Sequence, residues 1–95
     1  MRPLDPGLAQ LCWAVRLEAP TPALAALSVC ALRLASAQPG CLGGDAVAQL
    51  TYWDSVDAIA AWRDRVEQLV RQRLGRGAGE FEFTVSRRRA EDACA

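Results

Sequence analysis

Cysteine and histidine decide much of the chemistry open to this chain, because thiols and imidazoles are common nucleophiles, bases and metal ligands. The sequence has no histidine. A histidine-based hydrolase triad and a histidine-ligated zinc or haem site are therefore excluded for the chain alone. The four cysteines include no Cys-x-x-Cys pair, and they are Cys12, Cys30, Cys41 and Cys94. We expect small, buried, reduced thiols, no metal and no cofactor, although an even count would also permit two disulfides.

Arginine supplies all of the positive charge. The eleven basic residues are balanced by eleven acidic ones, so no overall field attracts nucleic acid or an anionic membrane. The Arg71–Arg76 cluster is typical of a solvated helix end, with phosphate binding as the weaker alternative. The Arg87–Arg89 run is followed at once by Glu91 and Asp92, which disfavours a nucleic-acid-binding tail.

Length and hydropathy indicate one globular domain spanning residues 1–95. The chain is 52% hydrophobic and 23% charged, which is ordinary for a folded protein. A monomer of this size buries only ~60–65% of its unfolded surface, so a partner subunit would help. No apolar run approaches the ~18–20 residues of a membrane span, and residues 1–7 lack the apolar core of a signal peptide. We therefore expect a cytoplasmic protein.

The first half of the chain predicts a strand, a helix and a hairpin. Residues 10–18 alternate between apolar and other side chains, which favours a strand. A helix over residues 22–37 would be capped by Thr21 and would end before Pro39-Gly40. Cys41-Leu42 is expected to form a stub of strand, Gly43-Gly44-Asp45 the turn, and residues 46–53 the returning strand.

The second half predicts a long helix and a final strand. Asp54 is the expected cap of a helix that ends at Gly75. Its buried stripe would comprise Val56, Ile59, Val66, Leu69 and Val70, with Trp62 at the border. Residues 80–87 alternate Phe81, Phe83 and Val85 with Glu80, Glu82, Thr84 and Ser86, as a strand does. Residues 1–8 and the tail from Arg88 through 90–95 are expected to be flexible.

The predicted order is β-α-β-β-α-β, an α+β, ferredoxin-like arrangement in which two helices cover one face of a four-stranded antiparallel sheet. The opposite face needs something to pack against. A homodimer that closes two sheets into a barrel-like core would cover it and bury exposed aromatic side chains.

Two segments contain short motifs whose order and spacing are specific. The first is Gln38-Pro39-Gly40-Cys41-Leu42-Gly43. The second contains Tyr52-Trp53-Asp54-Ser55, Ala58, Ala61-Trp62-Arg63, Glu67, Arg71-Gln72 and Gly75-Arg76. Both segments resemble the antibiotic biosynthesis monooxygenase-like proteins, which belong to the dimeric α/β-barrel superfamily. The first is similar to the turn entering that family's second strand, and the second resembles its third strand and second helix. The likeness covers about residues 37–89, a little over half of the chain.

The resemblance implies a dimeric α/β barrel and, less specifically, a cofactor-free oxygenase acting on a small aromatic metabolite. Two features depart from the family pattern. Glu67-Gln68 stands where the family commonly has Glu-His, and the hairpin around Gly43-Gly44-Asp45 is short. The haem-degrading branch uses Asn, Trp and His, and this chain has neither Asn nor His, so that activity is rejected.

Cofactor-free oxygenation needs a dry cavity, a proton acceptor and polar groups that hold an enolate. Trp62 is expected to wall the cavity and donate its indole N–H to a substrate oxygen. Gln68 can exchange hydrogen bonds but cannot act as a base near neutral pH. Glu82, or alternatively Glu80, would be the base if burial raised its pKa. The expected substrate-binding residues are Trp13, Arg16, Tyr52, Trp62, Arg71 and Phe81.

Each candidate also has a plainer structural interpretation. Trp62 suits core packing, Tyr52 and Trp53 suit sheet and interface packing, and Gln68 suits a helix surface. Glu80 and Glu82 are also what a half-exposed strand presents. The alternative function is a non-catalytic homodimer that binds a ligand or serves structure or assembly. A third possibility is a dimer joined through the Phe81–Phe83 strand, with its outer helices presented to another protein.

Overall fold

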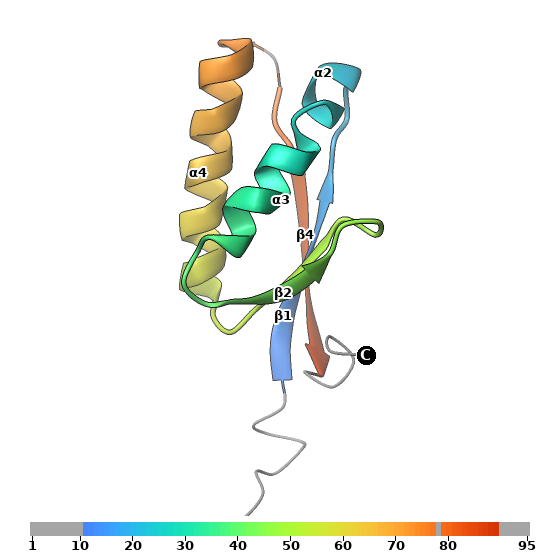
Figure 1. Ribbon diagram of the computed structural model, residues 1–95, viewed down its shortest axis with the longest axis vertical. Helices are drawn as coiled ribbons and strands as arrows, with labels where there is room; N and C mark the ends of the chain where they lie inside the picture. Colours follow the sequence, from blue (N-terminus) through green and yellow to red (C-terminus); the bar gives the residue numbers. More distant parts are fainter. Residues whose placement is uncertain (1–10, 78, 90–95) are drawn as a thin grey trace, which may run out of the picture.

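The structure is a computed structural model, and it describes residues 11–77 and 79–89 (Figure 1). The expected flexible segments 1–8 and 90–95 lie outside the described residues. The elements in chain order are β1 (Leu11–Glu18), α2 (Pro22–Ala25), α3 (Ser28–Ser36), β2 (Cys41–Asp45), β3 (Leu50–Trp53), α4 (Val56–Leu74) and β4 (Glu82–Arg89).

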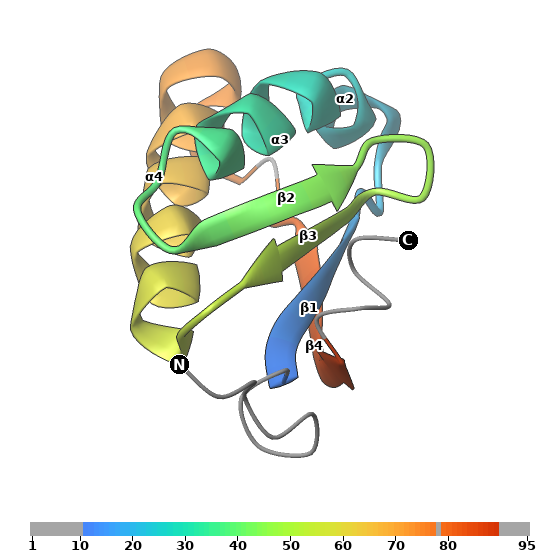
Figure 2. The ribbon, with the colours of Figure 1, turned by 60° about the horizontal axis from the view of Figure 1, so that its bottom comes forward.

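The four strands form one antiparallel sheet in the order β2-β3-β1-β4. The longest pairing joins β1 to β4, from Leu11 opposite Arg89 to Glu18 opposite Glu82. Figure 2 shows the helices on one side of this sheet. An α+β fold with a four-stranded antiparallel sheet is thus confirmed. Within the described residues, no helix combines the length and apolar character needed to cross a membrane.

The core lies between the helices and the sheet. The alternation of β1 directs Val15 and Leu17 toward the helices, where both are fully buried. The stripe of α4 that meets them comprises Ile59, Trp62, Val66 and Val70. Trp62 is therefore central to the stripe rather than at its border, and Val56, expected inside, is 53% exposed.

The first helical segment is interrupted rather than continuous. Thr21 caps α2 by accepting the Leu24 N–H on its hydroxyl oxygen, as expected. At Leu27 the backbone N–H donates to the Leu24 carbonyl, three residues back, which tightens the turn and separates α2 from α3. Both leucines are buried, so the break places two apolar side chains in the core. Local propensity does not reveal it, because the alanine-rich sequence favours helix throughout.

The turn between β2 and β3 lies later in the chain than expected. Gly43 and Gly44 belong to β2, and the turn occupies residues 46–49. Asp45 fixes it, because its Oδ1 accepts the backbone N–H of Val47 and Ala48 at 3.0 and 3.2 Å. A Cβ on Gly44 would lie 2.8 Å from the Leu50 carbonyl oxygen, so this glycine permits close strand approach rather than a turn.

Two boundaries in the second half also differ from the prediction. Ser55, not Asp54, caps α4, and its Oγ accepts the Ala58 N–H at 3.2 Å. Gly75 ends the helix as expected, with a positive φ of 76°. The last strand begins at Glu82 and continues to Arg89, so Arg88 belongs to the sheet rather than to a tail.

The sheet face away from the helices has a small apolar cluster. Cys12, Ala14 and Tyr52 form a buried cluster there, with Leu50 beside it. The register between β1 and β4 shows which residues of β4 lie on the same face. There are four, and all are exposed: Glu82, Thr84, Ser86 and Arg88. The expectation of exposed aromatics is wrong, because every aromatic side chain is buried or half-buried. The exposed β4 residues of this face are therefore polar or charged.

Candidate functional site

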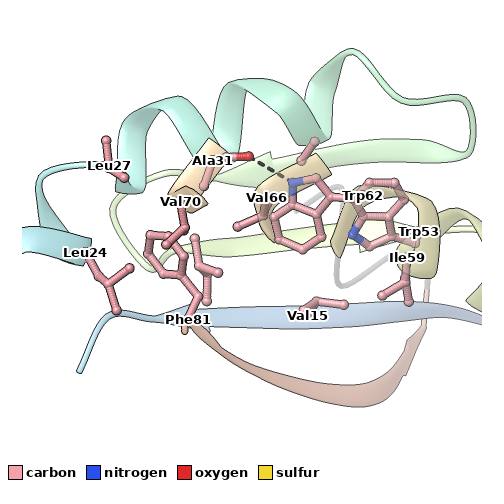
Figure 3. Close-up of a cluster of buried hydrophobic side chains, with 12 residues drawn as sticks. Val15, Leu24, Leu27, Ala31, Trp53, Ile59, Trp62, Val66, Val70 and Phe81 are labelled. Atoms are coloured by element: carbon pink, nitrogen blue, oxygen red, sulfur yellow. Dashed lines mark hydrogen bonds between the residues drawn. The ribbon is translucent and has the colours of Figure 1, made fainter. Parts of the chain in front are cut away.

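Trp62 is the centre of an aromatic cluster that links the core to the surface. Its ring stacks on Trp53 with centroids 5.3 Å apart and meets Phe83 edge-to-face at 5.2 Å. Its indole N–H donates to the Ala31 carbonyl oxygen at 2.9 Å, as Figure 3 shows. Because this N–H is already occupied and the ring is fully buried, Trp62 supports neighbouring rings rather than offering a donor to solvent.

A groove runs along the side of α4 that faces β4, and we name it the α4–β4 groove. Its volume is about 500 Å³. Its apolar lining is Val66 and Val70 from α4 with Phe81 and Phe83 from the returning chain. Its charged lining comprises Arg63, Glu67, Arg71, Arg76 and Glu80. The groove is thus apolar in part and carries three arginines against two glutamates.

The helical period explains how α4 builds both the core and this groove. Residues 62, 66 and 70 repeat along one stripe and are buried. Arg63, Glu67 and Arg71 repeat every four residues on the adjacent stripe, so they stand together along the groove. The helix then ends at Gly75, and the chain that follows brings Arg76 and Glu80 to the same groove.

Arg63 and Phe83 are the best-defined contact in the groove. The Arg63 guanidinium lies over the Phe83 ring, 5.1 Å from its centroid, in cation–π geometry. Phe83 therefore has Trp62 against it on the core side and a cation on the groove side. Among the residues that the structure describes, neither Arg71 nor Arg76 has an ion-pair partner. Their guanidinium groups remain available to an anion.

The structure brings together two of the expected substrate-binding residues, Arg71 and Phe81, with Glu80, the alternative candidate for the base. All three line the α4–β4 groove. Phe81 is 5% exposed and so contributes mainly a floor, whereas Arg71 and Glu80 are exposed. Trp62 does not line the groove but supports Phe83 from beneath.

The remaining candidates lie elsewhere. Gln68 is exposed on α4 but does not line the groove. Glu82 and Arg16 are exposed and belong to the opposite face of the sheet, where Tyr52 is buried beside Cys12. Trp13 lies on the helix side of the sheet, and the Arg87 guanidinium lies over its ring, 4.3 Å from the ring centroid. These residues do not form one site with the groove.

Arg63, Glu67 and Arg76 line the groove but were not chosen as site residues from sequence. The four-residue spacing of positions 63, 67 and 71 beside the buried stripe was the available signal. It could not be interpreted without knowing that β4 leaves this flank of α4 open.

No other feature of the described residues offers comparable chemistry. A smaller hollow of about 210 Å³ lies between α3 and β2, and Asp45 is its one charged lining residue among those described. No group of cysteine and acidic side chains in the described ranges could hold a metal ion. Cys30 and Cys41 are free thiols, and Cys94 lies outside the described residues.

Comparison of the chain with models of protein families, with curated proteins and with solved structures finds no match.

Proposed function

We propose that this chain binds a small aromatic anion, such as an aromatic carboxylate, in the α4–β4 groove. The observation that carries the proposal is the pairing of a floor containing Phe81 and Phe83 with three arginines at a groove of about 500 Å³. Small-molecule sites typically measure ~300–1,000 Å³ and combine an apolar lining with a few polar groups. The groove matches that description in size and in composition.

The arginines favour an anion over a neutral aromatic compound. Arg71 and Arg76 have no ion-pair partner among the described residues. A carboxylate can accept two parallel N–H bonds from one guanidinium, and such charge-assisted bonds are the strong ones. The aromatic part would lie on Val70, Phe81 and Phe83, where offset or edge-to-face ring contacts are favourable. Each end of the ligand thus has a matching part of the groove.

The test is calorimetric titration with 2-naphthoate and, as the uncharged counterpart, methyl 2-naphthoate. We expect binding of the acid and about tenfold weaker binding of the ester, because one charge-assisted contact contributes ~1.5 kcal/mol. Replacing Arg71 by glutamine should likewise weaken 2-naphthoate about tenfold while leaving the ester unchanged.

Arg33→Gln is the matched control, because Arg33 is an exposed helical arginine that does not line the groove. It should leave 2-naphthoate affinity within about twofold. Equal affinity for acid and ester, or equal losses in the Arg71 and Arg33 variants, would contradict the proposal.

Oxygenation of the bound aromatic compound is the second candidate function, and it rests on the resemblance of residues 37–89. The observation that favours it is the Glu80 carboxylate at the groove that also contains Arg71. A carboxylate could take the proton of a phenol while a guanidinium holds the resulting anion. An oxygen electrode with an anthrone substrate tests this. Uptake that falls in Glu80→Gln but not in Glu82→Gln supports it, and no uptake by the wild type removes it.

Two structural proposals accompany the function. The antiparallel order β2-β3-β1-β4, with helices on one side, supports assignment to the ferredoxin-like arrangement. We also propose that the protein is a cytoplasmic homodimer. The resemblance implies dimerisation by face-to-face closure of two sheets. The exposed residues that β4 contributes to that face are polar or charged and would add no apolar area to the closure: Glu82, Thr84, Ser86 and Arg88.

A further inference from the structure

Within the part of the chain that the structure describes, strand β4 forms one edge of the sheet, because it pairs with β1 alone. An edge strand presents unpaired backbone N–H and C=O groups to its outer side, which can pair with another strand. β4 is eight residues long, and its side chains from Thr84 to Arg88 are exposed. Trp62 and Arg63 of α4 contact Phe83 near the start of β4, whereas Val85, also on the helix side of β4, remains 44% exposed.

The charges of β4 are arranged so that the strand complements itself when reversed. Glu82 stands at its beginning and Arg88 near its end, and both project from the face away from the helices. Neither has an ion-pair partner among the described residues of its own chain. Glu82 instead faces Glu18 directly across the β1–β4 pairing, and like charges at opposed positions are unfavourable.

We propose that two copies of this chain pair antiparallel through β4, about a two-fold axis at Val85 that is perpendicular to the sheet. Such an axis keeps the helices of both copies on the same side and joins the two sheets into one. Glu82 of each copy then faces Arg88 of the other, and the two Val85 side chains meet at the centre. On the helix side, Phe83 lies opposite Arg87 of the second copy.

The charge pattern favours this register over the others that keep the helices of both copies on the same side of the joined sheet. Side-chain alternation allows the axis to lie only on a residue, not between residues. An axis at Ser86 would place Arg88 opposite Thr84 and leave Glu82 and Arg88 without partners. An axis at Thr84 would place Glu82 opposite Ser86, and Arg88 would face only Glu80, which precedes the strand. The axis at Val85 pairs both charges within β4, and it does so twice.

Sedimentation velocity over about 5–300 µM protein tests the proposal. A contact between one pair of strands is small, so we expect a weak dimer whose mass rises from 10.3 kDa toward twice that value with concentration. Glu82→Arg should weaken dimerisation about tenfold or more, because two attractive pairs become repulsive. Arg88→Glu should act in the same way, and the double variant should restore the wild-type dimer.

Glu82→Arg should not unfold the domain, because it replaces the Glu18–Glu82 contact with an opposite-charge pair. Asp64→Arg is the control, since Asp64 is exposed on α4 and does not line the groove, and it should leave the dimer unchanged. A wild type that stays monomeric at 300 µM, or single variants that dimerise as tightly as the wild type, would overturn the proposal. At 5 µM, where the wild type is also monomeric, Glu82→Arg should retain 2-naphthoate binding. Failure of the dimer would therefore leave the proposed ligand site standing.

Discussion

The two flanks of α4 differ in how completely they are occupied. On the flank toward α3 and β3, Trp62 is fully buried, its N–H is bonded to Ala31, and its ring stacks on Trp53. On the flank toward β4, one residue further along, Arg63 and Arg71 border an open groove. Adjacent positions on one helix thus serve a closed core and an open surface lined by cations.

This difference suggests that stability and binding are carried by separate sets of residues. The stripe of Trp62, Val66 and Val70 holds the helix on the sheet, and hydrophobic burial is the dominant favourable term in folding. The arginines beside it add little to stability, because exposed charges contribute at most about 1 kcal/mol. Substitutions in the core should therefore change unfolding, whereas substitutions along the groove should change affinity.

Removal of the Trp62 side chain should have the largest effect. Trp62→Ala deletes the stacking on Trp53 and the edge contact with Phe83 and leaves a cavity, at a cost of about 3–5 kcal/mol. Urea unfolding followed by circular dichroism measures the loss. Val47→Ala, at a position that is 97% exposed, should change stability by less than about 0.5 kcal/mol. A Trp62→Ala variant as stable as the wild type would contradict the claim that the buried stripe of α4 carries the stability.

Trp62→Phe should have an intermediate effect, because it keeps an aromatic ring and removes the N–H that donates to Ala31. We expect a loss of about 1–2 kcal/mol from the missing bond and the smaller ring. If the flanks act separately, the folded variant should bind 2-naphthoate within about twofold of the wild type. A tenfold loss of affinity at unchanged stability would place Trp62 in the binding site instead.

Arg63→Gln should destabilise the fold less than either Trp62 substitution and sharpens the comparison, since Arg63 lines the groove and also contacts Phe83. Loss of the guanidinium over Phe83 should destabilise the fold by about 0.5–1 kcal/mol. The same change should weaken 2-naphthoate a few-fold without affecting its methyl ester. Parallel urea and calorimetric titrations separate the two effects. Equal weakening of acid and ester would show that Arg63 acts only by orienting Phe83.

Much of the architecture follows from local patterns in the sequence. The alternation in residues 11–18, the Thr21 cap and the glycine at position 75 mark a strand, a helix start and a helix end. The features that sequence did not reveal depend on distant contacts. Gly43-Gly44 resembles a turn locally, but Gly44 lies against the Leu50 carbonyl, and Asp45 forms the turn instead. The break at Leu27 similarly follows from core packing rather than helix propensity.

The candidate site was less predictable than the fold. Arg71 and Phe81 were expected to bind a ligand, and both line the groove. Glu82, Gln68 and Arg16 were grouped with them because residue type alone does not say which face of a strand or helix borders a cavity. That information depends on how α4 packs on the sheet, which leaves one of its flanks open beside β4.

The central claim is that the α4–β4 groove is the binding site for an aromatic anion. The most direct measurement is a titration of isotope-labelled protein with 2-naphthoate, followed by two-dimensional amide NMR. We expect saturable shifts concentrated at Arg63, Arg71, Gly75, Phe81 and Phe83, with little change at Cys12, Tyr52 or the turn at residues 46–49. Saturable shifts centred on that opposite face, or no shifts at 10 mM ligand, would contradict the account.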